Sequence, residues 1–124
     1  MSSRPLIKPF PVVTNGDMSS NITSKVTVID NISIVSYDVS WTGTNPSGTI
    51  SVQVSNTYKA NAQGTVIVAG DWTSLPLSST PTISQSTGNG CIDIDVTGFN
   101  AIRLVYTANS GSGTMQVTMA AKVA

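Results

Sequence analysis

Apolar and polar residues alternate with a period of two along most of this chain. In the segment 32–42 the apolar residues Val35, Tyr37, Val39 and Trp41 occupy every second position, whereas Ile32 and Ile34 are out of phase with this stripe. Because successive side chains of an extended strand point to opposite faces, this spacing predicts a strand with one buried face. No window of ten or more residues has helical periodicity, and β-branched and hydroxyl residues are abundant. The pattern predicts an all-β protein.

The alternation is clearest near the C-terminus, at residues 101–122. Two arms flank the sequence Asn-Ser-Gly-Ser-Gly at 109–113, and their apolar positions are Ile102, Leu104, Tyr106, Met115, Val117 and Met119. Glycine supplies the positive φ that a chain reversal needs, so we expect 101–122 to be a β-hairpin. A two-stranded hairpin is not stable alone, and we therefore expect the rest of the chain to pack around it.

Further short strands are predicted between turn-forming residues. Apolar alternation recurs at 22–29, 50–55 and 92–96, with turns expected at 45–48 and 88–90. The total of about eight or nine short strands is typical of two packed antiparallel sheets, a jelly-roll-like sandwich. A small closed barrel is the alternative. The 124 residues contain no repeat or linker, so we expect a single domain over 1–124.

The N-terminal residues 1–13 contain three prolines and predict an extended arm rather than a central strand. The arm is apolar enough to need cover and has local positive charge. The residues expected to bind a partner are Arg4, Leu6, Ile7, Lys8 and Phe10. In the alternative interpretation the arm packs on its own sandwich and seals a sheet edge.

Charge excludes several functions. The formal net charge is zero, the six acidic residues are all Asp, and the chain has neither His nor Glu. A neutral chain has no basic field for nucleic acid or an anionic membrane, so neither partner is expected.

The start of the chain lacks the apolar region of a signal peptide, which predicts synthesis in the cytoplasm. A neutral surface rich in hydroxyl groups favours association, and we expect a homo-oligomer, namely a trimer.

Catalytic and metal-binding residues are not expected. Cys91 has no His to activate it and is interpreted as a small, partly buried apolar residue. Asp93 and Asp95 share the outer face of one strand, where solvated carboxylates are more common than a glycosidase pair. A calcium site that uses Asp71, Asp93 or Asp95 stays open. We therefore expect a protein that is not an enzyme and needs no cofactor.

Some aromatic residues are candidates for glycan binding. Trp41 continues the apolar stripe of its strand and is expected in the core, whereas Tyr58 lies in a polar segment and is expected to be exposed. Tyr58 and Trp72 are the candidate residues for stacking on a sugar ring. Arg103 is expected either to pair with Asp93 or Asp95 or to face a neighbouring subunit.

Several segments together resemble small β-sandwich structural proteins of phage virions. The matching segments are residues 39–43, 48–56, 72–75, 92–94, 102–107 and 110–114. The resemblance covers about 32–122 and implies a sandwich fold and a virion location, as in capsid decoration, head-fibre or tail accessory proteins, which are generally homo-oligomeric. It implies capsid or tail proteins as partners and carries over no functional residue. The alternative function is a carbohydrate-binding module or a phage receptor-binding domain.

Overall fold

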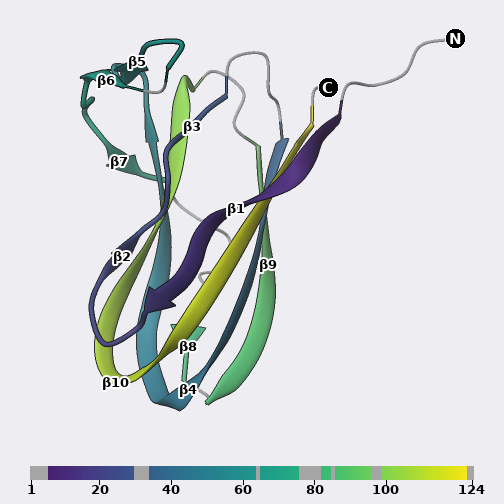
Figure 1. Cartoon of the computed structure of the whole chain (residues 1–124), viewed down its shortest axis with the longest axis vertical. Helices are drawn as coiled ribbons and strands as arrows, with labels where there is room; N and C mark the ends of the chain where they lie inside the picture. Colours follow the sequence, from purple (N-terminus) through teal and green to yellow (C-terminus); the bar gives the residue numbers. More distant parts are fainter. Residues whose placement is uncertain are drawn as a thin grey trace, which may run out of the picture.

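The computed structural model describes residues 6–29, 34–63, 65–75, 82–84, 86–95 and 99–122, with only the backbone described at 6–8, 82, 95 and 122. These residues contain no helix, and therefore none that could cross a membrane (Figure 1). The strands are β1 (Leu6–Asp17), β2 (Ile22–Thr23), β3 (Thr27–Val28), β4 (Ile34–Ser55), β5 (Lys59–Ala60), β6 (Val66–Val68), β7 (Thr73–Ser74), β8 (Thr82–Ile83), β9 (Thr87–Asp95) and β10 (Ala101–Lys122).

The centre of the fold is a two-stranded ribbon made by β4 and β10. Each strand has 22 residues, and the two pair antiparallel from Ile34↔Lys122 at one end to Ser55↔Ala101 at the other. The predicted C-terminal hairpin is therefore wrong, because residues 109–113 lie inside β10 and do not reverse the chain. The predicted turns at 45–48 and 88–90 are wrong for the same reason, since they lie inside β4 and β9.

The residues that predicted turns instead bend the ribbon. The pairing shifts register between Ala108 and Ser112, and the backbone has positive φ at Asn45 (48°) and Gly111 (80°), one residue in each strand. A Cβ atom at Gly111 would collide with the carbonyl group of Asn45, so the two strands approach closely where they bend. Asn and Gly tolerate this conformation whether or not the chain then reverses, which is why sequence alone did not separate a bend from a turn.

The bend folds the ribbon into two sheets. In the first sheet, β1 pairs with the C-terminal half of β10, and β9 pairs with the N-terminal half of β4. In the second sheet, β2 and β3 pair with the N-terminal half of β10, and β7 and β8 pair with the C-terminal half of β4. Figure 1 shows the ribbon bending near the labels of β4 and β10. All these pairings are antiparallel, and the predicted jelly-roll-like sandwich is confirmed.

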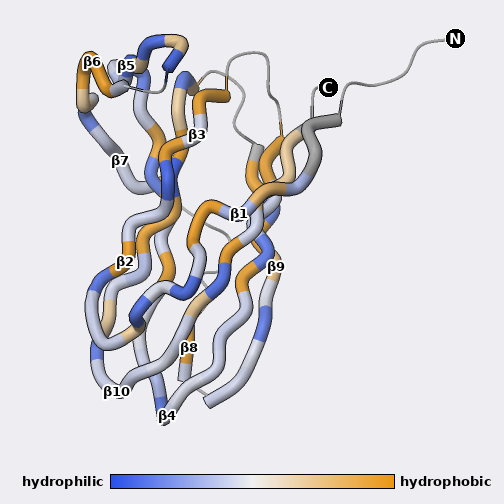
Figure 2. The backbone as a smooth tube through the Cα atoms, viewed as in Figure 1, coloured by the Kyte–Doolittle hydropathy of each residue, from blue (hydrophilic) through white to orange (hydrophobic). Residues whose placement is uncertain are grey.

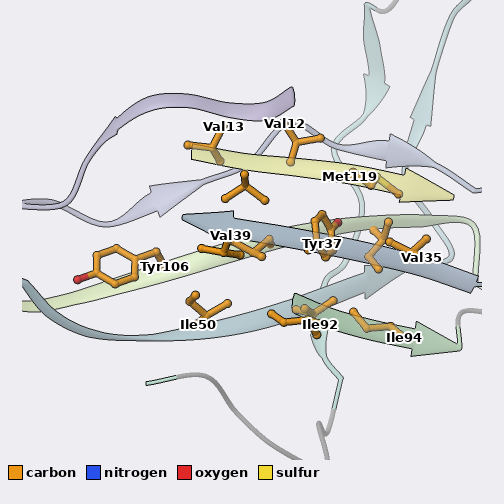
Figure 3. Packing of buried hydrophobic residues seen from close by; sticks show 14 of the residues in the cluster. Val12, Val13, Val35, Tyr37, Val39, Ile50, Ile92, Ile94, Tyr106 and Met119 are labelled. Carbon is orange, nitrogen blue, oxygen red and sulfur yellow. The ribbon is translucent and has the colours of Figure 1, made fainter. Parts of the chain in front are cut away.

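The core lies between the two sheets and comes mostly from the ribbon (Figure 3). Its side chains are those that alternation predicted, although the inward positions of β4 are odd-numbered before the bend and even-numbered after it. The ribbon residues buried in this way are Val35, Tyr37, Val39, Ile50, Val52, Val54, Ile102, Leu104, Tyr106, Met115, Val117, Met119 and Ala121. Burial of one such large apolar side chain stabilises a fold by roughly 1.5–3 kcal/mol. Trp41 is only half-buried and packs against the edge of this core.

Strand β1 covers one edge of the ribbon. It pairs with β10 from Leu6↔Lys122 to Asp17↔Thr114, with three register irregularities around its two prolines and Gly16. Proline lacks a donor for a regular ladder, so an irregular edge strand is where it fits. Val12 and Val13 are buried in the core. From Leu6 onwards, the N-terminal segment packs on its own sandwich.

Candidate functional site

A short two-stranded sheet projects from the end of the second sheet, between β4 and β7. It consists of β5 and β6, which pair through Lys59↔Val68 and Ala60↔Val66, and we call residues 59–68 the finger. Three consecutive apolar side chains in β6 are exposed, with exposed fractions of 52% for Val66, 65% for Ile67 and 41% for Val68. Figure 2 shows this apolar strand at the outer limit of the fold. Apolar residues that cluster on an exposed strand indicate an interaction surface.

The loop of the finger is ordered by one side chain. The Asn61 carboxamide oxygen accepts hydrogen bonds from the backbone N–H of Gln63 (3.0 Å) and of Thr65 (2.9 Å). The backbone N–H of Asn61 also donates to the carbonyl of Thr65 (2.9 Å). Asn commonly bonds to backbone N–H groups in this way in turns. The exposed side chains of Val66, Ile67 and Val68 therefore follow a backbone segment that is held by these hydrogen bonds.

The base of the finger is held by hydrogen bonds between polar groups. The Ser55 hydroxyl accepts hydrogen bonds from the backbone N–H of Thr57 and of Tyr58, both at 3.2 Å, and Ser55 itself is buried. The Asn100 carboxamide donates to the Tyr58 carbonyl (2.7 Å), and the Thr57 hydroxyl accepts from the Asp71 N–H (2.7 Å). The Thr57–Asp71 bond joins the two ends of the segment that contains the finger, and the Tyr58–Asn100 bond joins this segment to the sandwich.

Tyr58, Trp72 and Arg103 form a cluster beside this base. The Tyr58 and Trp72 ring centroids lie 5.8 Å apart, and the Arg103 guanidinium lies 4.2 Å from the centroid of the Trp72 ring. Arg103 also donates from Nε to the Gln53 carboxamide oxygen (2.7 Å). Partial burial lowers the pKa of Arg103, but a guanidinium keeps its charge at neutral pH. A cation over an aromatic face is a favourable contact, so Trp72 is fixed in place.

This cluster corrects two predictions. Tyr58 has an exposed fraction of 7% and is buried, so the expectation of an exposed tyrosine is wrong. The segment 56–63 is polar, and the Ser55 and Asn100 bonds that fold it back could not be seen in the sequence. Arg103 contacts Gln53 and Trp72 on the second sheet, whereas Asp93 lies on the first, so the expected pair with Asp93 is also wrong. The predicted stacking of Tyr58 and Trp72 on a sugar stays a prediction.

An open hollow of about 420 Å³ lies next to the cluster. It is lined by Val54, Ser55, Asn56, Thr57, Asp71, Thr73, Ser74, Leu75 and Phe99. Neither Tyr58 nor Trp72 is among the lining residues, so the aromatic ring that faces this space is that of Phe99. Phe99 could not be identified as a site residue from the sequence, because a single aromatic residue after a glycine forms no recognisable pattern.

A second hollow, of about 380 Å³, lies where β4, β9 and β10 run side by side near the bend. Its lining residues are mostly hydroxyl and amide side chains, with one aromatic residue: Ser40, Trp41, Thr42, Thr87, Gly88, Asn89, Thr114 and Gln116. Asn15 and Gln116 exchange hydrogen bonds beside it. The lining of this hollow is thus neutral and polar.

The predicted partner-binding residues of the N-terminal arm belong to β1 or precede it. Arg4 lies outside the described residues. At Leu6, Ile7 and Lys8 only the backbone is described, and Leu6 and Ile7 pair with β10. Phe10 is half-buried and packs against the core. The arm thus seals an edge of its own sandwich, as the alternative interpretation held, and its role in binding a partner stays a prediction.

Cys91 was expected to be partly buried, and this is wrong. It is exposed on the outer face of β9, where its sulfur lies 3.2 Å from the Ser36 hydroxyl and 3.8 Å from an Asp93 carboxylate oxygen. The alternation of β9 is as predicted, because Ile92 and Ile94 are buried and Asp93 is exposed. Within the described residues, no three Cys, Asp, Glu or His side chains gather as a metal site would require.

Comparison with known proteins shows likeness in structure but not in sequence. No protein-family model matches the chain, and no curated protein matches it. The SPBc2 prophage-derived protein YomS has a similar structure, with a TM-score of 0.53 and 11% identity over 97% of this chain and 96% of that one.

Two further similar structures come from virus particles. One is from the infectious bursal disease virus Gx strain (TM-score 0.56, 10% identity) and one from the T13 IBDV viral particle (TM-score 0.53, 12% identity). They match 98% and 97% of this chain, which spans about a third of their own length (32% and 31%). At these identities the likeness shows a common β-sandwich fold.

Proposed function

We propose that this chain is a non-enzymatic structural subunit of a virus particle, of the phage decoration or head and tail accessory type. The observation that supports it is the match to the prophage-derived protein YomS along nearly the full length of both chains. The matches to chains of infectious bursal disease virus support the same class of function. The subunit self-associates, as a trimer, and binds a capsid or tail surface.

The surface of the molecule is suited to such assembly. The net charge is zero, so copies packed at high density do not repel one another. The hollow on the first sheet has a neutral, polar lining, whereas the finger presents Val66, Ile67 and Val68. Association through apolar burial and strand edges needs no charged partner.

The test is whether the protein occurs in particles. Particles from the source of this sequence would be purified on a density gradient, and their proteins identified by mass spectrometry. We expect this chain at a fixed ratio to the major shell protein in every particle fraction. Its presence only in the lysate, and never in the particle band, would contradict the proposal.

Glycan binding is a second candidate, because the hollow beside β7 combines an aromatic ring with polar groups. Phe99 offers a ring for stacking, and Asp71 and Asn56 offer hydrogen-bonding groups in a space of about 420 Å³. A glycan array on the purified protein tests this candidate. Binding that Asp71→Ala and Phe99→Ala both abolish would favour it, and an array without signal would reject it.

A further inference from the structure

We propose that copies of this chain associate head to tail, with the finger of one copy docking on the free edge of β3 in the next copy. This inference deepens the proposed function and names the surface that its self-association uses. The apolar residues concerned are Val66, Ile67 and Val68 on the finger and Val28 on β3, whose exposed fraction is 47%.

The finger and the β3 edge lie on opposite sides of the β3–β10–β4 sheet and at the same end of it. Ala101 of β10 pairs with Ser55 of β4 on one side and with Val28 of β3 on the other. The finger leaves β4 just after Ser55 and returns as β7, which pairs with Gln53 and Val54. In the described chain, β10 and β4 therefore separate the finger from the β3 edge, and Figure 1 shows β6 and β3 at the same end of the molecule.

This placement favours a second copy as the occupant. Within the described residues, β6 pairs only with β5, and β3 pairs only with β10, so each leaves one strand edge unpaired. A stable interface needs about 800 Å² on each partner, which is more than three half-exposed side chains provide. Backbone pairing between two strand edges supplies further contact, and this chain offers both edges itself.

Charge and symmetry also favour association between copies of this chain. Copies with zero net charge do not repel one another, and Lys59 is the only charged residue of the finger. A contact between two different surfaces is heterologous, and it forms a closed ring when the rotation between neighbours closes. A small ring is the assembly that the expected trimer requires.

Three substitutions test the contact by light scattering over a concentration series. Ile67→Asp disrupts the finger, and Val28→Asp disrupts the β3 edge. Ile34→Asp is the matched control, because Ile34 is exposed to a similar degree (46%) but lies at the end of β4 in the first sheet. We expect the parent and Ile34→Asp to have the same multiple of the 12.8 kDa chain mass, and both other variants to have the mass of one chain.

Mixing the two disrupted variants gives the decisive result. Ile67→Asp keeps an intact β3 edge and Val28→Asp keeps an intact finger, so an equimolar mixture should form one contact and a mass of two chains. A mixture that stays at one chain, or a parent that is a single chain at every concentration, overturns the proposal. Circular dichroism of each variant checks that it is folded.

The result is separable from the proposed function. A single-chain parent that is nevertheless found in purified particles rejects the head-to-tail contact and keeps the particle role. An oligomer that the variants disrupt as expected, but that is absent from particles, keeps the contact and rejects the particle role.

Discussion

At the scale of single residues, the core contains polar atoms that the packing leaves without partners. The hydroxyl groups of Tyr37 and Tyr106 are buried, and neither has a hydrogen-bond partner within the described residues. A buried hydroxyl without a partner costs about 1–3 kcal/mol relative to its hydrated state. The alternating pattern predicted that Tyr37 is buried, but it could not show where the hydroxyl would lie.

Tyr37→Phe is therefore expected to raise the free energy of unfolding at neutral pH, by about 1 kcal/mol, because it removes the unpaired hydroxyl and keeps the ring. Denaturant titration measures the change. Tyr37→Ala is the matched control and should lower the free energy of unfolding by about 3–5 kcal/mol, since it empties the same site. A Tyr37→Phe protein that is less stable than the parent would show that the hydroxyl is hydrogen-bonded.

The same residue predicts a dependence on alkaline pH. Burial raises the pKa of Tyr37 well above the 10.0 of an exposed tyrosine. Above pH 10 the unfolded chain loses this proton while the folded chain keeps it, so stability is fully present below pH 10 and falls as the pH rises further. Between pH 8 and pH 11 we expect the parent to lose more free energy of unfolding than Tyr37→Phe does, by roughly 1 kcal/mol. Denaturant midpoints at the two pH values give the difference, and equal losses would contradict this assignment.

At the scale of elements, the sequence predicted which residues face the core but not how the strands connect. The stripes Ile102–Leu104–Tyr106 and Met115–Val117–Met119 are buried as alternation required, because side-chain period is a local property. Whether residues 109–113 reverse the chain depends on what lies across from them. The partner is the stretch of β4 around Asn45 and Pro46, some 65 residues earlier in the chain, and such a pairing has no local signal.

In the candidate site, too, the sequence predicts which residues are present but not how exposed they are. The apolar run Val66–Val68 is visible in the sequence, but its exposure follows from the absence of a covering strand among the described residues. The burial of Tyr58 follows from a local bond to Ser55, three residues earlier, and from a bond to Asn100, which lies 42 residues later in the chain. The aromatic residues are visible in the sequence, but the expected exposure of Tyr58 is wrong, because its burial also depends on a contact with a distant part of the chain.

The bend can be tested with two glycines. Gly111→Ala places a Cβ atom against the Asn45 carbonyl at a φ of 80°, and we expect it to lower the free energy of unfolding by at least about 2 kcal/mol. Gly90→Ala is the matched control in β9, since its Cβ would meet nothing within 4 Å. Thermal melts of the two variants should differ by several degrees, and equal melting temperatures would mean that the bend tolerates a side chain at Gly111.

Two deletions separate the roles of the N-terminal segment. Removal of residues 2–11 uncovers Met119 and Ala121, which pair with Phe10 and Ile7, so it should lower the melting temperature by many degrees. Removal of residues 2–5 alone leaves β1 intact and should change the melting temperature by no more than two or three degrees. If Arg4 contributes to partner binding, the shorter deletion also weakens sedimentation with particles. A large loss of stability in the shorter deletion would show that residues 2–5 belong to the fold.

At the scale of the whole molecule, the fold depends on contacts between distant parts of the chain. Ile34 must pair with Lys122 on one side of β10, and Leu6 must pair with Lys122 on the other side. Closing such long loops lowers the entropy of the chain before burial of the core contributes favourable free energy. The folding nucleus of this sandwich therefore has a high free energy. We expect refolding from denaturant on a timescale of milliseconds to seconds, measured by Trp fluorescence in stopped flow. Refolding within tens of microseconds would contradict the non-local topology.

The pairing of β1 with β10 has a mechanical consequence. Leu6 and Lys122 are opposite each other at one end of the pair, which ends at Asp17 and Thr114. A force that pulls Leu6 and Lys122 apart would break the ladder bonds one after another, as a zip opens. A force applied between Leu6 and Thr114 would load the same bonds together in shear. A subunit tethered by both ends would therefore yield at lower force than one tethered by β1 and the bend.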